Sequence, residues 1–133
     1  MGQKVNPIGF RIAVDKNWRS RWFADKRAFG DLLDEDCKIR KYIQQKFANS
    51  AVAEVRIERY ANRVRINIHS ARPGVIMGHK GEDIAKVREE LSKKTGKEIY
   101  VEVTEVRDPD ANAQLVAEGI AQQIVRRIAL KRA

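Results

Sequence analysis

The tetrapeptide Gly78-His79-Lys80-Gly81 has the residue types and spacing in this sequence that best suit the binding of a ligand. Two glycines at this distance allow a tight turn and a close approach of the backbone to a bound group. Lys80 adds a positive charge, and a helix that begins after Gly81 would present free backbone N–H groups. This combination favours a phosphate backbone as the ligand. The spacing G-x-x-G also arises by chance, so a plain connector between two helices is the alternative interpretation.

Other phosphate-binding and catalytic motifs do not fit the sequence. A Walker A loop requires G-x-x-x-x-G-K-[ST], but the residue five positions after Gly74 is His79, and Lys80 is followed by Gly81. His69 and His79 stand apart from any cysteine or acidic cluster, so the sequence predicts no metal site. No nucleophile, base and oxyanion site come together, so we expect neither catalysis nor a cofactor.

Positive charge dominates the composition. The chain has 133 residues, with 27 Lys and Arg against 18 Asp and Glu, and a net charge of +9. This excess predicts a polyanionic partner. The excess lies in residues 1–30 and 37–81, whereas residues 31–36 are acidic. A single cysteine excludes an intrachain disulfide, and no apolar run reaches the ~18 residues of a membrane span, so we expect an intracellular chain without membrane contact.

Residues 1–30 combine basic side chains with five of the nine aromatic residues of the chain. Arginine and lysine neutralise phosphates, while aromatic rings stack on bases. The alternative, which the residues leave open, is that the aromatic side chains pack on the domain and fasten this arm to it. The candidate RNA-binding residues of the arm are Lys4, Arg11, Lys16, Trp18, Arg19, Arg21 and Trp22.

The hydrophobic pattern predicts both helices and strands after the arm. Apolar residues at helical spacing predict helices over about 37–49, 73–77, 82–95 and 111–131. Alternating apolar residues predict strands over about 54–58, 63–69 and 98–104. We expect Asp34 or Asp36 to cap the first helix, because a carboxylate there accepts hydrogen bonds from free backbone N–H groups. Three strands in one sheet with helices on one face make an α+β domain.

Longer sequence segments resemble a known family. The order of elements from residue 37 to 106, with G-H-K-G between two helices, resembles a type II K-homology (KH) domain. Four segments resemble the bacterial-type family of small-ribosomal-subunit protein S-three: MGQKVNPIGFRI at the start, NWRSRWF at 17–23, ARPGVIMGHKGEDI at 71–84 and QQIVRRIALKRA at the end. The resemblance covers essentially the whole chain.

The resemblance implies a type II KH fold with additions at both ends. This fold has a three-stranded mixed sheet with helices packed on one face, here with an extended basic N-terminal arm and a long C-terminal helix. We expect the arm and a linker over residues 1–36 and the KH RNA-binding domain over 37–109. Over 110–133 we expect a C-terminal helix that leads toward a second domain, which this chain lacks.

The resemblance also implies a structural, non-enzymatic constituent of the small ribosomal subunit. Members of the family bind ribosomal RNA in the head of the subunit, near the site where mRNA enters, and contact mRNA and neighbouring head proteins. We therefore expect a cytoplasmic ribosomal protein, with an organellar ribosome as the alternative location. On the residues alone two other functions stay open: a free-standing KH RNA chaperone or assembly factor, and a nucleic-acid lyase or nuclease.

The family places RNA at the loop that is formed here by Gly78, His79, Lys80 and Gly81. A KH groove clamps about four nucleotides of single-stranded backbone. Further candidate RNA-binding residues in the domain are Arg63, Arg65 and Arg72. The apolar residues expected to meet the base faces are Val75, Ile76, Ile84 and Val87. Aspartate at both Gly78 and Gly81 is expected to weaken RNA binding and to leave the fold intact.

Overall fold

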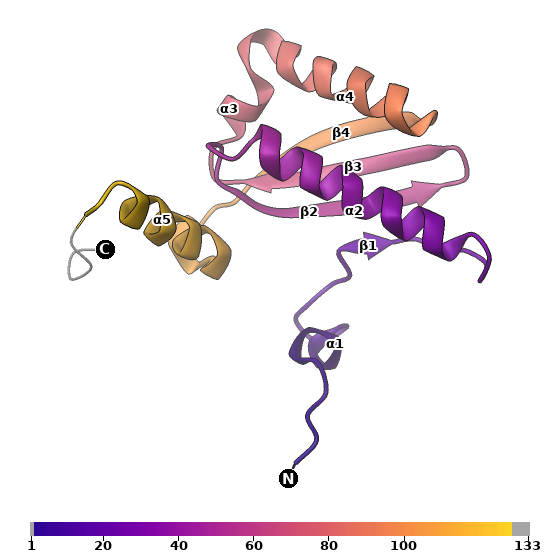
Figure 1. The fold of residues 1–133 in the computed structure, drawn as a ribbon, viewed down its shortest axis with the longest axis horizontal. Coiled ribbons are helices and arrows are strands. Elements are labelled where there is room, and N and C mark those ends of the chain that lie inside the picture. Colours follow the sequence, from indigo (N-terminus) through magenta and orange to yellow (C-terminus); the bar gives the residue numbers. More distant parts are fainter. Residues whose placement is uncertain (1, 129–133) are drawn as a thin grey trace.

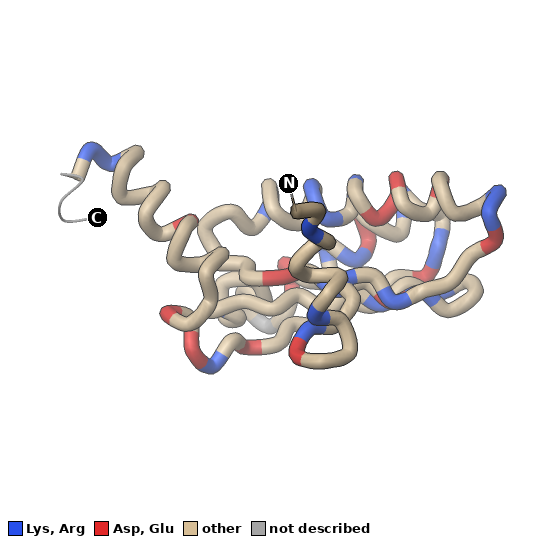
Figure 2. Tube along the Cα trace, turned by 90° about the horizontal axis from the view of Figure 1, so that it is seen from below, with Lys and Arg blue, Asp and Glu red and all other residues tan. Residues whose placement is uncertain are grey.

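A sheet and two long helices form the two layers of the molecule. The computed structural model describes residues 2–128, and within them the sheet has four strands in the order β1-β2-β3-β4 (Figure 1). The strands are β1 (Ser20–Arg21), β2 (Val52–Tyr60), β3 (Arg63–Ser70) and β4 (Glu98–Glu105). Helices α2 (Phe29–Lys46) and α4 (Glu82–Thr95) cover one face of the sheet (Figures 1 and 2). The α+β fold expected from the sequence is therefore confirmed.

The other elements are short or lie toward the ends of the chain. Helix α1 (Pro7–Arg11) belongs to the arm and lies away from the sheet (Figure 1). Helix α3 (Pro73–Met77) is followed by a 3-10 turn at His79–Gly81, and a second 3-10 turn at Pro109–Ala111 precedes helix α5 (Ala113–Val125). The order of these elements from α2 onward follows the predicted order.

The described part of the sheet has one strand more than the three predicted from the sequence. Ser20 and Arg21 of the arm lie parallel to Ile57 and Glu58 at the edge of β2. The Ile57 N–H donates to the carbonyl oxygen of Arg19 at 2.9 Å. Two residues are too few for an alternating pattern to reveal. This segment of the arm is therefore part of the sheet.

Isoleucine and valine line the inner face of the sheet, where α2 and α4 cover them. Ile57 pairs with Ile66 in the β2–β3 hairpin, and Ile66 pairs with Val101 in the parallel β3–β4 pair. The buried apolar side chains are Ile39, Ile43, Phe47, Val52, Val55, Ile57, Val64, Ile66, Ile68, Ile76, Val87, Leu91 and Ile99. Burial of such side chains contributes about 1.5–3 kcal/mol each. The core thus holds α3 and α4, and with them the turn between these helices, against the sheet.

Helix α2 begins earlier than predicted, and the predicted cap is wrong. The helix starts at Phe29, so Asp34 and Asp36 lie inside it, and its N-cap residue makes no side-chain hydrogen bond. Asp36 points inward and is fully buried. A search for apolar periodicity misses this beginning because the inward residue is a carboxylate. Residues 31–36 therefore lie within the first turns of α2.

Helix α5 is shorter than the helix predicted over 111–131. The Asn112 side chain caps it by accepting hydrogen bonds from two backbone N–H groups, and the helix ends at Val125. Residues 129–131 of the prediction lie outside the described residues. The helix has no buried residue, so its apolar stripe stays exposed. In the described part of the chain, no helix combines the length and the apolar character needed to cross a membrane.

Candidate nucleic-acid interface

The predicted phosphate-binding loop is a tight turn between α3 and α4. Gly78 follows α3 with φ +67°, and Gly81 precedes α4 with φ +83°. This region of φ favours glycine, because a Cβ atom would crowd the backbone. His79 is exposed in the 3-10 turn, and the backbone of Lys80 lies in the same turn, while the Lys80 side chain is outside the described part. The backbone geometry expected of the loop is therefore present.

Aspartate at Gly78 would strain the fold locally, a cost that the prediction from the sequence did not include. A Cβ atom at this position would lie 2.7 Å from the Cγ atom of Asp83 on α4, and the positive φ adds strain. Gly81 has no atom within 4 Å of the equivalent position, but its φ of +83° carries the same strain. Substitutions at His79 and Lys80 therefore test the loop with less damage to the backbone.

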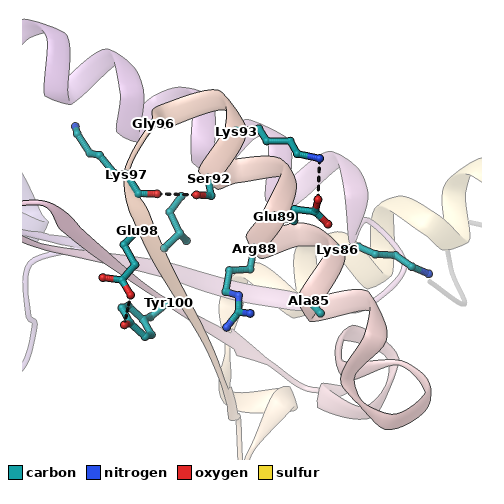
Figure 3. Close-up of a pocket in the computed structure, with 11 residues that line it drawn as sticks. Ala85, Lys86, Arg88, Glu89, Ser92, Lys93, Gly96, Lys97, Glu98 and Tyr100 are labelled. Atoms are coloured by element: carbon teal, nitrogen blue, oxygen red, sulfur yellow. Dashed lines mark hydrogen bonds and ion pairs between the residues drawn. The ribbon is translucent and has the colours of Figure 1, made fainter.

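A groove lies along the side of α4, the helix that follows the loop. It has a volume of about 870 Å³ and lies between α4 and β4, the last strand in the sheet order. Figure 3 shows Arg88 pointing from α4 toward β4, while Lys86 and Lys93 point outward. The turn at Gly96 and the start of β4 line the end of the groove that is remote from the loop. Because α4 begins directly after the loop, the loop and the groove lie along the same helix.

Most residues that line the groove are charged, and two of the four apolar residues expected to meet the bases are buried in the core. Ile76 and Val87 are fully buried in the core, and Ile84 packs against it half-buried. Val75 is exposed, but it lies on α3 and outside the groove. The charged residues that line the groove are Lys86, Arg88, Glu89, Lys93, Lys97 and Glu98. The sequence does not predict this set, because the pattern of polar residues on an amphipathic helix is the same whether they face solvent or a neighbouring strand.

Arg63 and Arg65 lie on the outer face of the sheet, away from the glycine loop. They alternate with inward side chains of β3, and the helices cover the opposite face (Figure 2). Arg63 Nε lies 3.0 Å from Glu98 Oε2, and Arg65 Nε lies 3.5 Å from Glu102 Oε1. The fold therefore does not bring these arginines together with the loop. Arg72, in contrast, is exposed at the N-cap of α3, the helix that leads into the loop.

The basic side chains of the arm face solvent. The exposed candidates are Lys4, Arg11, Lys16, Arg19 and Arg21. Arg21 lies 3.3 Å from Glu58, and Arg11 donates to the Pro7 carbonyl oxygen within α1. The arm follows the β1 edge of the sheet, whereas the groove follows the β4 edge. The two candidate surfaces therefore lie at opposite edges of the domain.

The aromatic residues of the arm divide between the two roles that the sequence left open. Trp22 is half-buried: its Nε1–H donates to Asp36 Oδ2 at 2.8 Å, and its ring centroid lies 5.3 Å from that of Phe29. Trp18 is 62% exposed and Phe23 is 92% exposed. Trp22 thus fastens the arm to α2, whereas Trp18 and Phe23 are accessible to a ligand.

Asp36 is the centre of a buried polar network that holds the arm. Its Oδ2 accepts hydrogen bonds from Trp22 and from the Ser20 hydroxyl, each at 2.8 Å. Its Oδ1 accepts a hydrogen bond from Arg59 Nε at 2.9 Å. Arg40 donates to Ser20 Oγ at 2.6 Å. Both oxygens of the buried carboxylate therefore have partners, as the burial of a charge requires.

The acidic segment of α2 is occupied by ion pairs. Asp34 Oδ2 lies 2.6 Å from the ammonium of Lys38, and Glu35 Oε2 lies 2.8 Å from that of Lys97. Within residues 2–128, no three His, Cys, Asp or Glu side chains are grouped so that they could hold a metal ion. Asp34 therefore pairs within α2, whereas Glu35 connects α2 with the turn before β4.

His69 makes the stability of the fold depend on pH. Its Nε2 is buried without a hydrogen-bond partner among the described residues, and burial, followed by the charge of Arg56, lowers its pKa below the ordinary 6.5. The unfolded chain therefore binds this proton more readily than the folded protein, so stability falls as the pH drops below 6.5. We expect the free energy of unfolding to decrease from about pH 7.5 to about pH 5, and less so in His69→Gln.

Chemical denaturation across this pH range measures the effect. His79→Gln removes an exposed histidine from the loop and is the matched control. The same pH dependence in His69→Gln and in the unsubstituted protein would contradict the assignment to His69.

A family model and a set of curated relatives both match this chain. The family model described as KH domain matches residues 38–111. All 133 residues are similar to curated relatives named "Small ribosomal subunit protein uS3", at 49% identity for Desulforamulus reducens and 51% for Carboxydothermus hydrogenoformans. Identity to the relative of the same name from Polaromonas sp. is also 51%. The chain spans 60%, 60% and 44% of the lengths of these three relatives.

Proposed function

This chain belongs to the KH domain family, and on that premise we propose that it binds RNA as a structural, non-enzymatic component of the small ribosomal subunit. The observation that carries the proposal is the similarity to uS3 relatives over the full 133 residues, at about half identity. A glycine loop that leads into a charged groove supports it. The resemblance predicted from the sequence is confirmed by the same matches.

The loop and the groove are the proposed contact for single-stranded RNA backbone. A phosphate can approach the backbone of Gly78 and Gly81 closely, because these residues have no side chain. Nucleotides then follow the groove, where Arg88 offers positive charge (Figure 3). Within residues 2–128, β4 pairs with β3 alone, so the backbone groups on its other side are free to bind base edges.

The arm is the proposed second contact. Its exposed lysines and arginines neutralise phosphates, and Trp18 offers an exposed ring on which a base can stack. Arg72 belongs with the loop by its position before α3. Arg63 and Arg65 lie on the outer face of the sheet, so they can bind only RNA that reaches this face. There they are paired with Glu98 and Glu102.

Within the ribosome, the proposed partner is the ribosomal RNA of the subunit head, near the site where mRNA enters. mRNA and neighbouring head proteins are the further proposed partners. The arm (1–36) and the KH domain (37–109) are the parts proposed to contact RNA. The helix in 110–133 is proposed to be a connecting segment. The proposed location is a cytoplasmic ribosome, with an organellar ribosome as the alternative.

Sedimentation with ribosomal subunits tests this function. We expect one chain to bind each small subunit from which uS3 has been removed, and none to bind intact subunits, whose site is occupied. A chain that binds free RNA but does not stay with the subunit would support an RNA chaperone in place of a ribosomal component. A chain that binds neither would contradict RNA binding altogether.

The salt dependence of RNA binding measures the contribution of the arm. Each phosphate contact adds about 0.7 to the slope of log K against log salt for a single strand. Replacing Lys4, Arg11 and Lys16 by glutamine is therefore expected to lower this slope by up to about 2. Lys38→Gln with Lys41→Gln, on the exposed side of α2, is the control and should leave the slope unchanged. Equal slopes for the arm variant and the unsubstituted chain would rule out phosphate contacts by the arm.

A further inference from the structure

One polar network connects the two proposed RNA-binding surfaces. Lys97 belongs to the turn at the remote end of the groove, but its side chain points away from the groove (Figure 3) and places its Nζ 2.8 Å from Glu35 Oε2 on α2. The same carboxylate oxygen accepts a hydrogen bond from Arg59 Nη1 at 3.1 Å, and Arg59 Nε donates to Asp36 at 2.9 Å. Asp36 in turn accepts the indole N–H of Trp22 at 2.8 Å. A continuous series of hydrogen bonds therefore runs from Lys97, in the turn at the end of the groove, across α2 and β2 to the arm.

The centre of this network, Asp36 and Arg59, is shielded from water, unlike the other ion pairs of α2. The side chains of Asp36 and Arg59 are 0% and 7% exposed, and that of Glu35 is 19% exposed. Hydrogen bonds between charged groups are strong and directional in such surroundings. The pair Lys38–Asp34 on the same helix is 75% and 62% exposed, and such pairs fix little geometry. The buried network is therefore the part of α2 that can set the position of the arm.

We propose that Asp36 and Glu35 are positioning residues, which hold the N-terminal arm in a fixed relation to the groove. This inference rests on the proposed function, because it concerns the same two surfaces. Two contacts held in a fixed relation bind a long or folded RNA more tightly, since the first contact raises the effective concentration for the second. An RNA that is too short to reach both surfaces does not gain affinity from this arrangement. The network thus makes the chain prefer an RNA that spans both edges of the domain.

The test loosens the arm while it keeps the ion pair of Asp36 with Arg59. Ser20→Ala with Trp22→Phe removes the two hydrogen bonds to Asp36 Oδ2 and keeps the pair of Asp36 with Arg59. Asp34→Asn is the matched control, because it removes an exposed carboxylate from the same helix. We expect trypsin to cleave the arm about tenfold faster in the double variant, and at an unchanged rate in the control.

Two RNA probes distinguish positioning from a general loss of binding. Small-subunit ribosomal RNA transcribed in vitro is long enough to reach both surfaces, whereas a single strand of about six nucleotides occupies the groove alone. The variant Ser20→Ala with Trp22→Phe is expected to bind the ribosomal RNA about tenfold more weakly and the short strand with unchanged affinity. Glu35→Gln, which weakens the link to Lys97 at the other end of the network, should show the same selectivity.

Each other outcome rejects a specific part of the proposal. Faster cleavage of the arm with unchanged affinity for ribosomal RNA would show that the position of the arm does not matter for binding. Equal weakening for both RNA probes would mean that the network only supports the domain. An unaltered cleavage rate would show that Asp36 does not hold the arm. Failure of the unsubstituted chain to bind either RNA would reject the proposed function instead, and the cleavage rate would still decide the role of Asp36.

Discussion

Replacing Arg59 by methionine is expected to lower the free energy of unfolding by about 3–5 kcal/mol. Arg59 donates to Asp36 at 2.9 Å, and both side chains are almost completely buried. Methionine fills much of the same space but leaves the carboxylate without its cation. A buried charge without a partner is costly, because the apolar surroundings solvate it poorly. Urea denaturation at constant pH measures the change.

Two further variants identify the cause of this loss. Arg63→Met breaks an exposed ion pair with Glu98 and is expected to change the free energy of unfolding by about 0–1 kcal/mol. Adding Asp36→Asn to Arg59→Met removes the unpaired charge and is expected to restore part of the stability. If Arg59→Met and Arg63→Met destabilised the protein equally, burial of the Asp36 pair would not be the reason.

Reversing the charge of the glycine loop is expected to weaken RNA binding by about 10- to 100-fold. The change is His79→Asp with Lys80→Asp, which keeps both glycines in their positive-φ conformations. A hydrogen bond between charged groups contributes about 1.5–3 kcal/mol, and the new carboxylates also repel phosphates. The fold should persist, because negative charge before a helix suits the helix dipole. Fluorescence anisotropy with a labelled strand of about six nucleotides measures the affinity.

A charge reversal elsewhere is the control for the loop variant. Lys38→Asp with Lys41→Asp makes a similar change in net charge on the exposed side of α2. Circular dichroism and thermal unfolding establish that both variants are folded. We expect the α2 variant to lose at most about threefold in affinity, through the weaker overall field of the protein. A loss as large as that of the loop variant would mean that net charge, and not the loop, controls binding.

Local patterns along the chain predict most of the domain. The alternation of Val64, Ile66 and Ile68 predicts both a strand and its inner face, and all three side chains are buried as expected. Gly78 and Gly81 mark the turn, which has the positive φ values that glycine tolerates. These predictions succeed because periodicity and backbone preference are properties of neighbouring residues. The family resemblance, which rests on four segments that are similar to the family, is also a property of the sequence by itself.

The partners of the polar residues follow only from the tertiary structure. Asp36 looks like a helix cap in the sequence, but it is a buried acceptor for Trp22 and Arg59, which are 14 and 23 residues away. Arg63 and Arg88 are both exposed cations, yet one is paired on the outer face of the sheet and the other lines the groove. Apolar side chains are all buried in the same core, so the spacing of these residues shows which face of a helix or strand points inward. The partner of a charged side chain can be far away in the sequence, so only the tertiary structure shows which residue it is.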